Sequence, residues 1–173
     1  MSRSQSAALP IAYVVLRILT VLNWLSAVFI LILLLLSPNE RWIMSAFDLT
    51  PSPDTTRLII GMRTIAMLGL AAIPLNHAIL QRLIAMVLTV RAGDPFVGSN
   101  ARRLFIVAWA LLGLQLLGIA IGAIADLVST PAHPLHLDAG FSVNGWLAVL
   151  LTFILARVFG EGTQMRDELE GTV

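Results

Sequence analysis

The sequence lacks cysteine and lysine, and it contains few charged residues of any kind. Without cysteine the chain has no disulfide, no thiolate metal ligand and no thiol nucleophile. Charged residues make up 12% of the 173 positions, about half of the roughly 25% that is typical of soluble domains. Hydrophobic residues make up 58%, and the mean hydropathy is +0.89. This composition predicts a single membrane domain over residues 1–173.

Four long apolar runs dominate the chain, at residues 11–36, 58–80, 104–128 and 143–159. A membrane-spanning helix needs about 20 mostly apolar residues, with a range of about 17–25. No alternating pattern of strands is present, and only structures that pair every backbone group can cross lipid. The first run is too long for the core of a signal peptide, and no small-residue cleavage site follows it. We therefore expect an all-α, integral membrane four-helix bundle that retains its first span.

The placement of the arginines predicts the orientation of these spans. Because arginine is enriched on the cytoplasmic side of membrane proteins, the side with more arginine is expected inside. One set of flanks holds Arg41, Arg57 and Arg63, and the opposite set holds the other eight arginines. We expect a multi-pass protein of the inner cell membrane with both termini in the cytoplasm. Residues 161–173 are then a cytoplasmic tail.

The segment between the second and third runs has a pattern of its own. Residues 79–91 suit a short amphipathic helix that either lies at the membrane face or extends the second span. Pro74 is expected to kink or break the second span. Gly93, Asp94 and Pro95 predict a turn, and Ser99 or Asn100 is expected to cap the third span.

Polar side chains inside the spans deserve attention because they are costly in lipid and are often functional. There are four main examples: Asn23, Arg63, Gln115 and Asp126. One interpretation is a proton or ion relay. The other is hydrogen bonding between helices combined with snorkelling, in which Asp126 is free to pair with Arg63. The second is favoured, because no carboxylate lies near the middle of any span.

Gly118 and Gly122 form a G-x-x-x-G pattern in the third span, and small residues of this kind let helices approach closely. Two interpretations remain open. The glycines either form a dimer interface, which would make the protein a homo-oligomer, or they serve packing within the four-helix bundle.

His133, His136 and Asp138 are residue types that bind metals. The prolines among them interrupt any helix that would fix their spacing, and the sequence suggests no fourth ligand. We therefore expect an incidental polar loop rather than a metal site.

Signs of catalysis are missing from the sequence. It offers no nucleophile and base in a recognisable pattern, no paired catalytic carboxylates and no phosphate-binding loop. The inner arginines are accounted for by topology, and no aromatic residues are interleaved with them, so direct nucleic-acid binding is not expected. We expect no cofactor and no enzymatic activity.

Two stretches of the C-terminal half form distinctive motifs. The first joins a G-D-P-F turn to the start of the third span: Gly93, Asp94, Pro95, Phe96, Asn100, Arg102, Arg103 and Leu104. The second runs through the end of the chain: Ala156, Val158, Phe159, Gly162, Met165, Arg166, Glu168, Glu170, Thr172 and Val173. Together they resemble the bacterial membrane-protein family called domain of unknown function 2975.

The resemblance implies a four-span protein whose biochemical activity is not established. Members of that family look like companions of small helix-turn-helix regulators, which implies a membrane partner of a cytoplasmic transcription factor. The alternative is a small transporter or channel subunit, in which the intramembrane polar residues would line a path.

The charges of the tail and the inner loop are complementary. Residues 82–103 carry four arginines and one aspartate, whereas the tail carries Glu161, Asp167, Glu168 and Glu170 against Arg166. We therefore predict that the tail docks on the loop of its own chain. Gly160 and Gly162 are expected to let the chain leave the last span, after which residues 165–170 resume a short helix. The competing interpretation is a solvated end to the last span.

Overall fold

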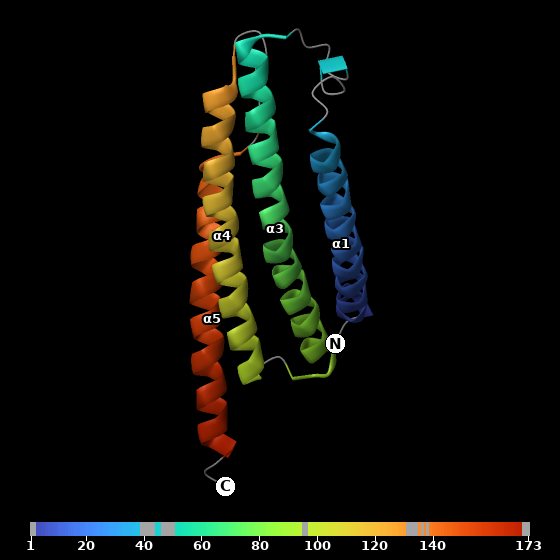
Figure 1. Cartoon of the computed structure of the whole chain (residues 1–173). Coiled ribbons are helices and arrows are strands. Elements are labelled where there is room, and N and C mark those ends of the chain that lie inside the picture. The colour runs from blue at the N-terminus through green and yellow to red at the C-terminus, as the bar shows by residue number, and fades with distance from the viewer. Residues whose placement is uncertain are drawn as a thin grey trace. The chain divides into compact units, whose positions relative to one another are not determined.

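The computed structural model describes residues 3–38, 44–45, 51–94, 97–130, 135, 137 and 139–170. The long elements within these ranges are all α-helices: α1 (Arg3–Leu36), α3 (Pro53–Arg91), α4 (Gly98–Val128) and α5 (Val143–Glu170) (Figure 1). None of the described residues is in a strand. The predicted all-α class is confirmed.

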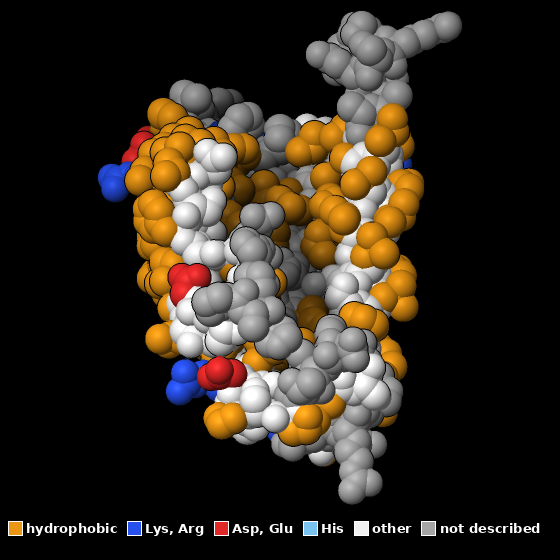
Figure 2. Space-filling model, turned by 90° about the horizontal axis from the view of Figure 1, so that it is seen from above, with side chains coloured by type: hydrophobic (Ala, Val, Ile, Leu, Met, Phe, Trp, Pro, Cys, Tyr) orange, Lys and Arg blue, Asp and Glu red, His pale blue; other side chains and the backbone are white. Residues whose placement is uncertain are grey.

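Each of the four helices is long and apolar enough to cross a membrane. The qualifying segments are Leu9–Leu36, Pro53–Arg91, Gly98–Val128 and Val143–Arg166. Large apolar side chains cover the outer surfaces of the helices that Figure 2 presents, and Leu127 is 76% exposed. Soluble monomers rarely expose apolar patches of this extent. The surface therefore suits a lipid environment, as the four-span prediction requires.

The start of α3 shows how the sequence defines a helix end. Ser52 precedes Pro53, and its hydroxyl accepts a hydrogen bond from the Thr55 backbone amide at 3.1 Å. The Ser52 and Thr55 hydroxyls are also hydrogen bonded, at 2.9 Å. A serine cap satisfies an amide that the helix leaves unpaired, and proline is well suited to the first helical position because its missing amide is not needed there.

The segment that follows the second apolar run belongs to α3. The helix continues to Arg91, so residues 79–91 extend the second span and do not form a separate helix at the membrane face. Pro74 lies inside α3 and does not break it. Proline removes a single helical hydrogen bond, and in a membrane the surrounding structure commonly accommodates that loss.

The expected break in the last span is wrong, because α5 is continuous through Gly160 and Gly162 as far as Glu170. A glycine costs a helix only about 1 kcal/mol relative to alanine. Local contacts support the helix here: Arg157 forms an ion pair with Glu161 one turn later, at 3.0 Å. The Thr163 hydroxyl also donates to the Phe159 carbonyl at 2.8 Å.

The chain divides into two compact units. The first comprises Met1–Asn23, Pro74–Gly113 and Val143–Val173, and the second comprises Trp24–Ile73 and Leu114–Ser142. Within α3 the boundary falls at Pro74. The first unit buries the following apolar side chains: Ile84, Leu104, Val107, Ala108, Ala110, Val149 and Ala156. In the second unit Leu58 and Val128 form a buried cluster, against which Met44, Met62 and Leu135 pack.

Candidate functional site

The α3–α4 connection lies in the first unit and begins with a glycine turn. Gly93 has a φ of +86°, in the left-handed region that glycine adopts without a steric penalty. The Gly93 amide donates to the Val90 carbonyl and the Asp94 amide donates to the Thr89 carbonyl, both at 3.1 Å. This is the Schellman pattern of helix termination. Gly93 therefore ends α3 and sets the direction in which the connection leaves the helix.

Asn100 joins the start of α4 to the last turns of α3. Its side chain is almost fully buried, with 1% exposed. Its amide nitrogen donates to the Thr89 hydroxyl at 2.8 Å, and its amide oxygen accepts from Arg103 Nη1 at 2.7 Å. The Thr89 hydroxyl in turn donates to the Met86 carbonyl at 2.8 Å. Both polar atoms of this buried side-chain amide thus have a hydrogen-bond partner, as is usual for buried polar groups.

The capping role predicted for Ser99 or Asn100 is wrong. The helix α4 begins at Gly98, so both residues lie inside its first turn. The Asn100 side chain instead forms hydrogen bonds with Thr89 of α3 and with Arg103.

Small residues bring the end of α5 close to the start of α4. A Cβ atom added to Gly160 would lie 3.9 Å from the Ala101 Cβ, and one added to Gly98 would lie 3.7 Å from Thr163 Cγ2. Both are ordinary van der Waals distances. Gly160 therefore lies next to α4 within a continuous helix and does not end that helix.

Further along the same pair of helices, three aromatic rings pack edge to face. The ring centroids of Phe105 and Phe153 lie 5.7 Å apart, and those of Trp109 and Phe153 lie 5.6 Å apart. The Phe105 and Trp109 centroids are 6.2 Å apart. Such pairs each contribute about 0.5–1.5 kcal/mol beyond their buried area. The aromatic cluster holds α4 against α5 within the first unit.

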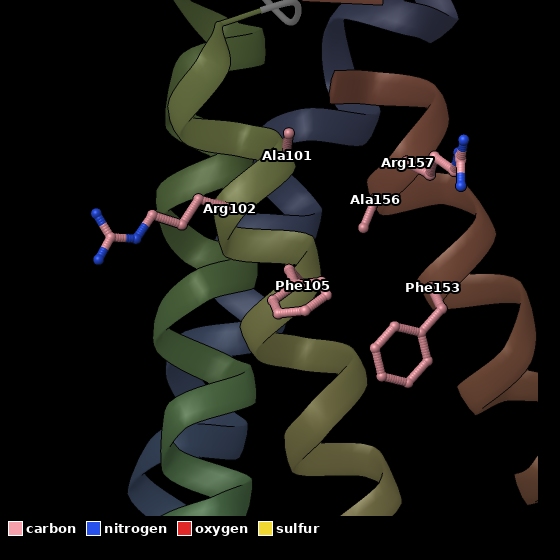
Figure 3. Close-up of a pocket in the computed structure, with 6 residues that line it drawn as sticks. All are labelled: Ala101, Arg102, Phe105, Phe153, Ala156 and Arg157. Atoms are coloured by element: carbon pink, nitrogen blue, oxygen red, sulfur yellow. The ribbon is translucent and has the colours of Figure 1, made fainter. Parts of the chain in front are cut away.

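An open groove of about 550 Å³ lies between α4 and α5, lined by Ala101, Arg102, Phe105, Phe153, Ala156 and Arg157. Figure 3 shows Phe105, Phe153 and Ala156 turned toward the space between the helices, whereas the guanidinium groups of Arg102 and Arg157 point away on opposite sides. Since no polar side chains converge in it, this groove has the character of a packing surface and not of a catalytic pocket.

The two motif stretches meet at one ion pair. Arg166 Nη1, near the end of α5, lies 2.6 Å from Asp94 Oδ1 in the α3–α4 connection. The side chains are 45% and 43% exposed, respectively. The tail thus contacts the loop of its own chain, but the polarity is the reverse of the expected one. In this pair the tail supplies the cation and the loop supplies the carboxylate. Of the loop arginines, Arg103 is turned toward Asn100 and the Ala85 carbonyl.

Several of the motif residues fall outside the described part of the chain. They are Pro95, Phe96, Thr172 and Val173, together with the side chains of Asp167 and Glu170. Arg102 is exposed at the edge of the α4–α5 groove. Glu168 is exposed on the last turn of α5.

The intramembrane polar residues do not assemble into a cluster of ion pairs. In the second unit, Arg63 Nη2 donates to the Ser37 carbonyl, and Gln115 Nε2 donates to the Ser142 carbonyl at 3.2 Å. Asp126 is exposed, and the structure, which describes both side chains, shows no ion pair between it and Arg63. Asn23 is half-buried on α1.

The two glycines of the G-x-x-x-G pattern face backbone of their own chain. A Cβ atom on Gly122 would lie 2.8 Å from the Ala139 carbonyl oxygen and 2.9 Å from the Gly140 Cα. On Gly118 it would lie 3.8 Å from the Gly140 oxygen. The glycines therefore admit the segment that precedes α5, a role that neither interpretation of the pattern had considered.

The candidate metal ligands His133, His136 and Asp138 lie outside the described residues. Among the residues that are described, no group of three histidine, aspartate or glutamate side chains is arranged to hold a metal ion.

The sequence did not predict the contact of Thr89 with Asn100 or the pairing of Arg166 with Asp94. Thr89 carried a signal, because it continues a stripe of small or polar residues at four-residue spacing with Gln81 and Ala85. Such a stripe marks one helix face, and that face receives Asn100 and Arg103 of α4. The pairing of Arg166 with Asp94 spans 72 residues, so no local pattern could have indicated it.

Four apolar helices with a lipid-suited surface define a helical membrane protein. Within that class, the chain belongs to the family described as "Protein of unknown function (DUF2975)", whose model matches residues 38–173. The match includes the α3–α4 connection and the end of α5, and it confirms the resemblance drawn from the motifs there. No curated protein and no solved structure matches the chain.

Proposed function

We propose that this protein is a non-enzymatic membrane protein that holds a cytoplasmic protein partner at its α3–α4 connection and the end of α5. We call this region the docking surface and define it as residues 93–103 and 160–170. The observation that carries the proposal is the Arg166–Asp94 ion pair, which joins the two most distinctive stretches of the sequence in one place. A surface made by two motifs far apart in the chain is suited to recognition of a partner.

The partner proposed is a small helix-turn-helix regulator, the class that the family resemblance implies. A cytoplasmic regulator requires the docking surface to face the cytoplasm. The excess of arginine around Arg82, Arg91, Arg102 and Arg103 supports that orientation, with both termini inside and the protein in the inner cell membrane.

The ion pair is weak enough for a partner to open. Pairs between exposed side chains contribute about 0–1 kcal/mol and are screened by salt. A partner that offers a carboxylate to Arg166 or a cation to Asp94 replaces one exposed pair with another at little cost. The same contact is therefore suited to a latch between the tail and the connection.

The experiment measures capture of cytoplasmic proteins by the full-length protein in detergent, with the captured proteins identified by mass spectrometry. Charge reversal in Arg166→Asp or Asp94→Arg is expected to change the amount of a helix-turn-helix protein that is captured. The double reversal restores the pair and is expected to bring capture back toward the original level. Arg157→Asp is the control for a charge reversal elsewhere on α5: Arg157 lies outside the docking surface and forms its exposed ion pair with Glu161, not with the α3–α4 connection.

A cysteine lock tests whether the docking surface must open. The chain has no cysteine, so Ala101→Cys with Gly160→Cys forms a single defined pair. The distance of 3.9 Å between the two Cβ positions matches the mean of about 3.8 Å in disulfides. We expect the oxidised pair to capture less partner than the same protein after reduction. Equal capture in both states, together with no effect of the charge reversals, would contradict the proposal.

The alternative of a transporter or channel subunit requires a continuous polar path. Arg63 and Gln115 instead each donate to a backbone carbonyl near the end of an apolar segment. No observation therefore favours that alternative. Substrate flux through proteoliposomes that disappears in Asp126→Asn would support it over partner docking.

A further inference from the structure

Two arginines from different helices meet at one tyrosine in the first unit. The guanidinium carbons of Arg17 on α1 and Arg91 at the end of α3 lie 5.4 and 5.9 Å from the centroid of the Tyr13 ring. Arg17 Nε also donates to the Tyr13 hydroxyl at 3.2 Å. Both arginine side chains are exposed. We call Tyr13, Arg17 and Arg91 the arginine cluster.

The arginine cluster carries positive charge that the described part of the chain leaves uncompensated. Within that part, carboxylate ion pairs are formed by Arg157 and Arg166, and not by Arg17 or Arg91. A cation over an exposed aromatic ring gains little, and two like charges beside one ring repel each other. The arrangement is therefore electrostatically suited to an anion.

An apolar groove of about 440 Å³ lies beside the cluster. Its walls come from α1 and α3: Leu9, Ala12, Val15, Leu16, Leu83, Met86, Val87 and Val90. Each member of the cluster directly follows a groove residue in the chain: Tyr13 follows Ala12, Arg17 follows Leu16 and Arg91 follows Val90. Since one residue is a rotation of about 100° around a helix, the arginine cluster borders the groove.

The surroundings of the cluster face lipid. Ile11, Val14 and Ile18 on the same stretch of α1 are all exposed, in a segment apolar enough to cross a membrane. Arg17 lies eight residues after Leu9, or about 12 Å along the helix axis. A long arginine side chain near the end of a span keeps its stem in the apolar region and extends its guanidinium group toward the headgroup level.

From the pairing of an uncompensated arginine cluster with an apolar groove, we propose a binding site for an anionic phospholipid. The lipid phosphate binds beside Tyr13, where the side chains of Arg17 and Arg91 reach it, and one acyl chain occupies the groove between α1 and α3. Basic pockets between membrane helices bind anionic headgroups in this way. The site is separate from the docking surface, and its occupation does not depend on any protein partner.

The groove between α4 and α5 is the contrasting case. It too has two arginines at its edge, but Arg102 and Arg157 point to opposite sides (Figure 3), and Arg157 already pairs with Glu161. That groove lacks a common position for a phosphate. Its arginines therefore supply the matched control for the proposed lipid site.

The experiment is native mass spectrometry of the detergent-solubilised protein after titration with phosphatidylglycerol or with phosphatidylcholine of the same acyl chains. Hydrogen bonds to charged groups contribute about 1.5–3 kcal/mol, which corresponds to a factor of about ten or more in affinity. We expect at least one phosphatidylglycerol to be retained, with at least tenfold weaker retention in Arg17→Gln/Arg91→Gln. Arg102→Gln/Arg157→Gln is expected to retain the lipid like the unmodified protein.

Two further measurements keep the lipid proposal testable. Ala12→Trp fills the groove and leaves the arginines in place. We therefore expect this variant to bind phosphatidylglycerol more weakly, while inorganic phosphate still competes with the lipid for the site. Helical circular dichroism and a monodisperse elution peak show that each variant is folded. Equal retention of the two lipids, unchanged retention in the Arg17/Arg91 variant, or equally tight binding of inorganic phosphate alone would each overturn the proposal.

Discussion

The α3–α4 and α4–α5 connections are held in opposite ways. In the first, a buried asparagine, a threonine and an arginine form side-chain hydrogen bonds between two helices. In the second, the backbone at residues 139–140 lies directly against two glycines of α4. One connection depends on polar complementarity and the other on the absence of side chains. The family motifs fall on the polar one, which also carries the exposed Arg166–Asp94 pair.

The two kinds of contact tolerate different substitutions. A connection held by shape has little room for added atoms, because the nearest neighbours of Gly122 are backbone atoms that cannot rotate away. A connection held by hydrogen bonds is sensitive to lost partners, because the groups left behind stay buried. The exposed Arg166–Asp94 ion pair tolerates substitution better than either connection, since water can replace either partner.

The largest effect is expected for Gly122→Ala. Its Cβ atom would lie 2.8–3.0 Å from three backbone atoms of residues 139–140, and overpacking typically costs about 1–3 kcal/mol. We expect a loss near the upper end, measured by thermal unfolding in detergent. Gly118→Ala is the matched control: its contact at 3.8 Å is ordinary, and helix propensity favours alanine by about 1 kcal/mol. Equal stability of the two variants would contradict the shape-based account.

A smaller effect, of about 2 kcal/mol, is expected for Asn100→Ala. This change removes the acceptor of Arg103 Nη1 and the donor to Thr89, and an unsatisfied buried polar group costs about 1–3 kcal/mol. Ser99→Ala changes the exposed neighbour in the same helical turn and is expected to leave stability nearly unchanged. The free energy of unfolding is measured as for the glycine variants. A neutral Asn100→Ala would show that the polar contacts do not hold the connection.

The smallest effect on stability is expected at the ion pair. Arg166→Ala and Asp94→Ala should each cost less than about 1 kcal/mol, and less still at high salt, because both side chains are partly exposed. A double-mutant cycle measures the coupling between them. A coupling that does not fall with added salt would contradict the picture of a weak, solvent-exposed latch.

A fourth measurement links the ion pair to helix packing. Oxidation of the Ala101→Cys/Gly160→Cys protein is expected to give a nearly complete disulfide, because the Cβ positions lie 3.9 Å apart. In the Asp94→Ala background the rate of formation should fall only slightly, since the small residues and the aromatic cluster still hold α4 against α5. A large fall would show that the ion pair, and not the packing, positions the end of α5.

Much of the fold follows from local pattern. The four apolar runs predicted the four helices, because a spanning helix depends on length and composition within one segment. The glycine turn at Gly93 was also predictable from its local sequence. The ends of the helices were harder to predict, because α3 and α5 both extend beyond the apolar runs. Contacts with α4 stabilise those extensions, and the residue pattern of a single helix does not predict such contacts.

Hydrophobicity and motif content are properties of the amino-acid sequence, so the four membrane-spanning helices and the family could be predicted without the structure. Which residues of the two motifs contact each other became known from the packing of the helices. The ion pair that the structure shows between the tail and the loop joins Arg166 to Asp94, with the opposite polarity to the one that net charge predicted. Net charge is a sum over a segment, whereas a contact depends on which side chains the packed helices bring within reach and which, like Arg103, are already engaged elsewhere.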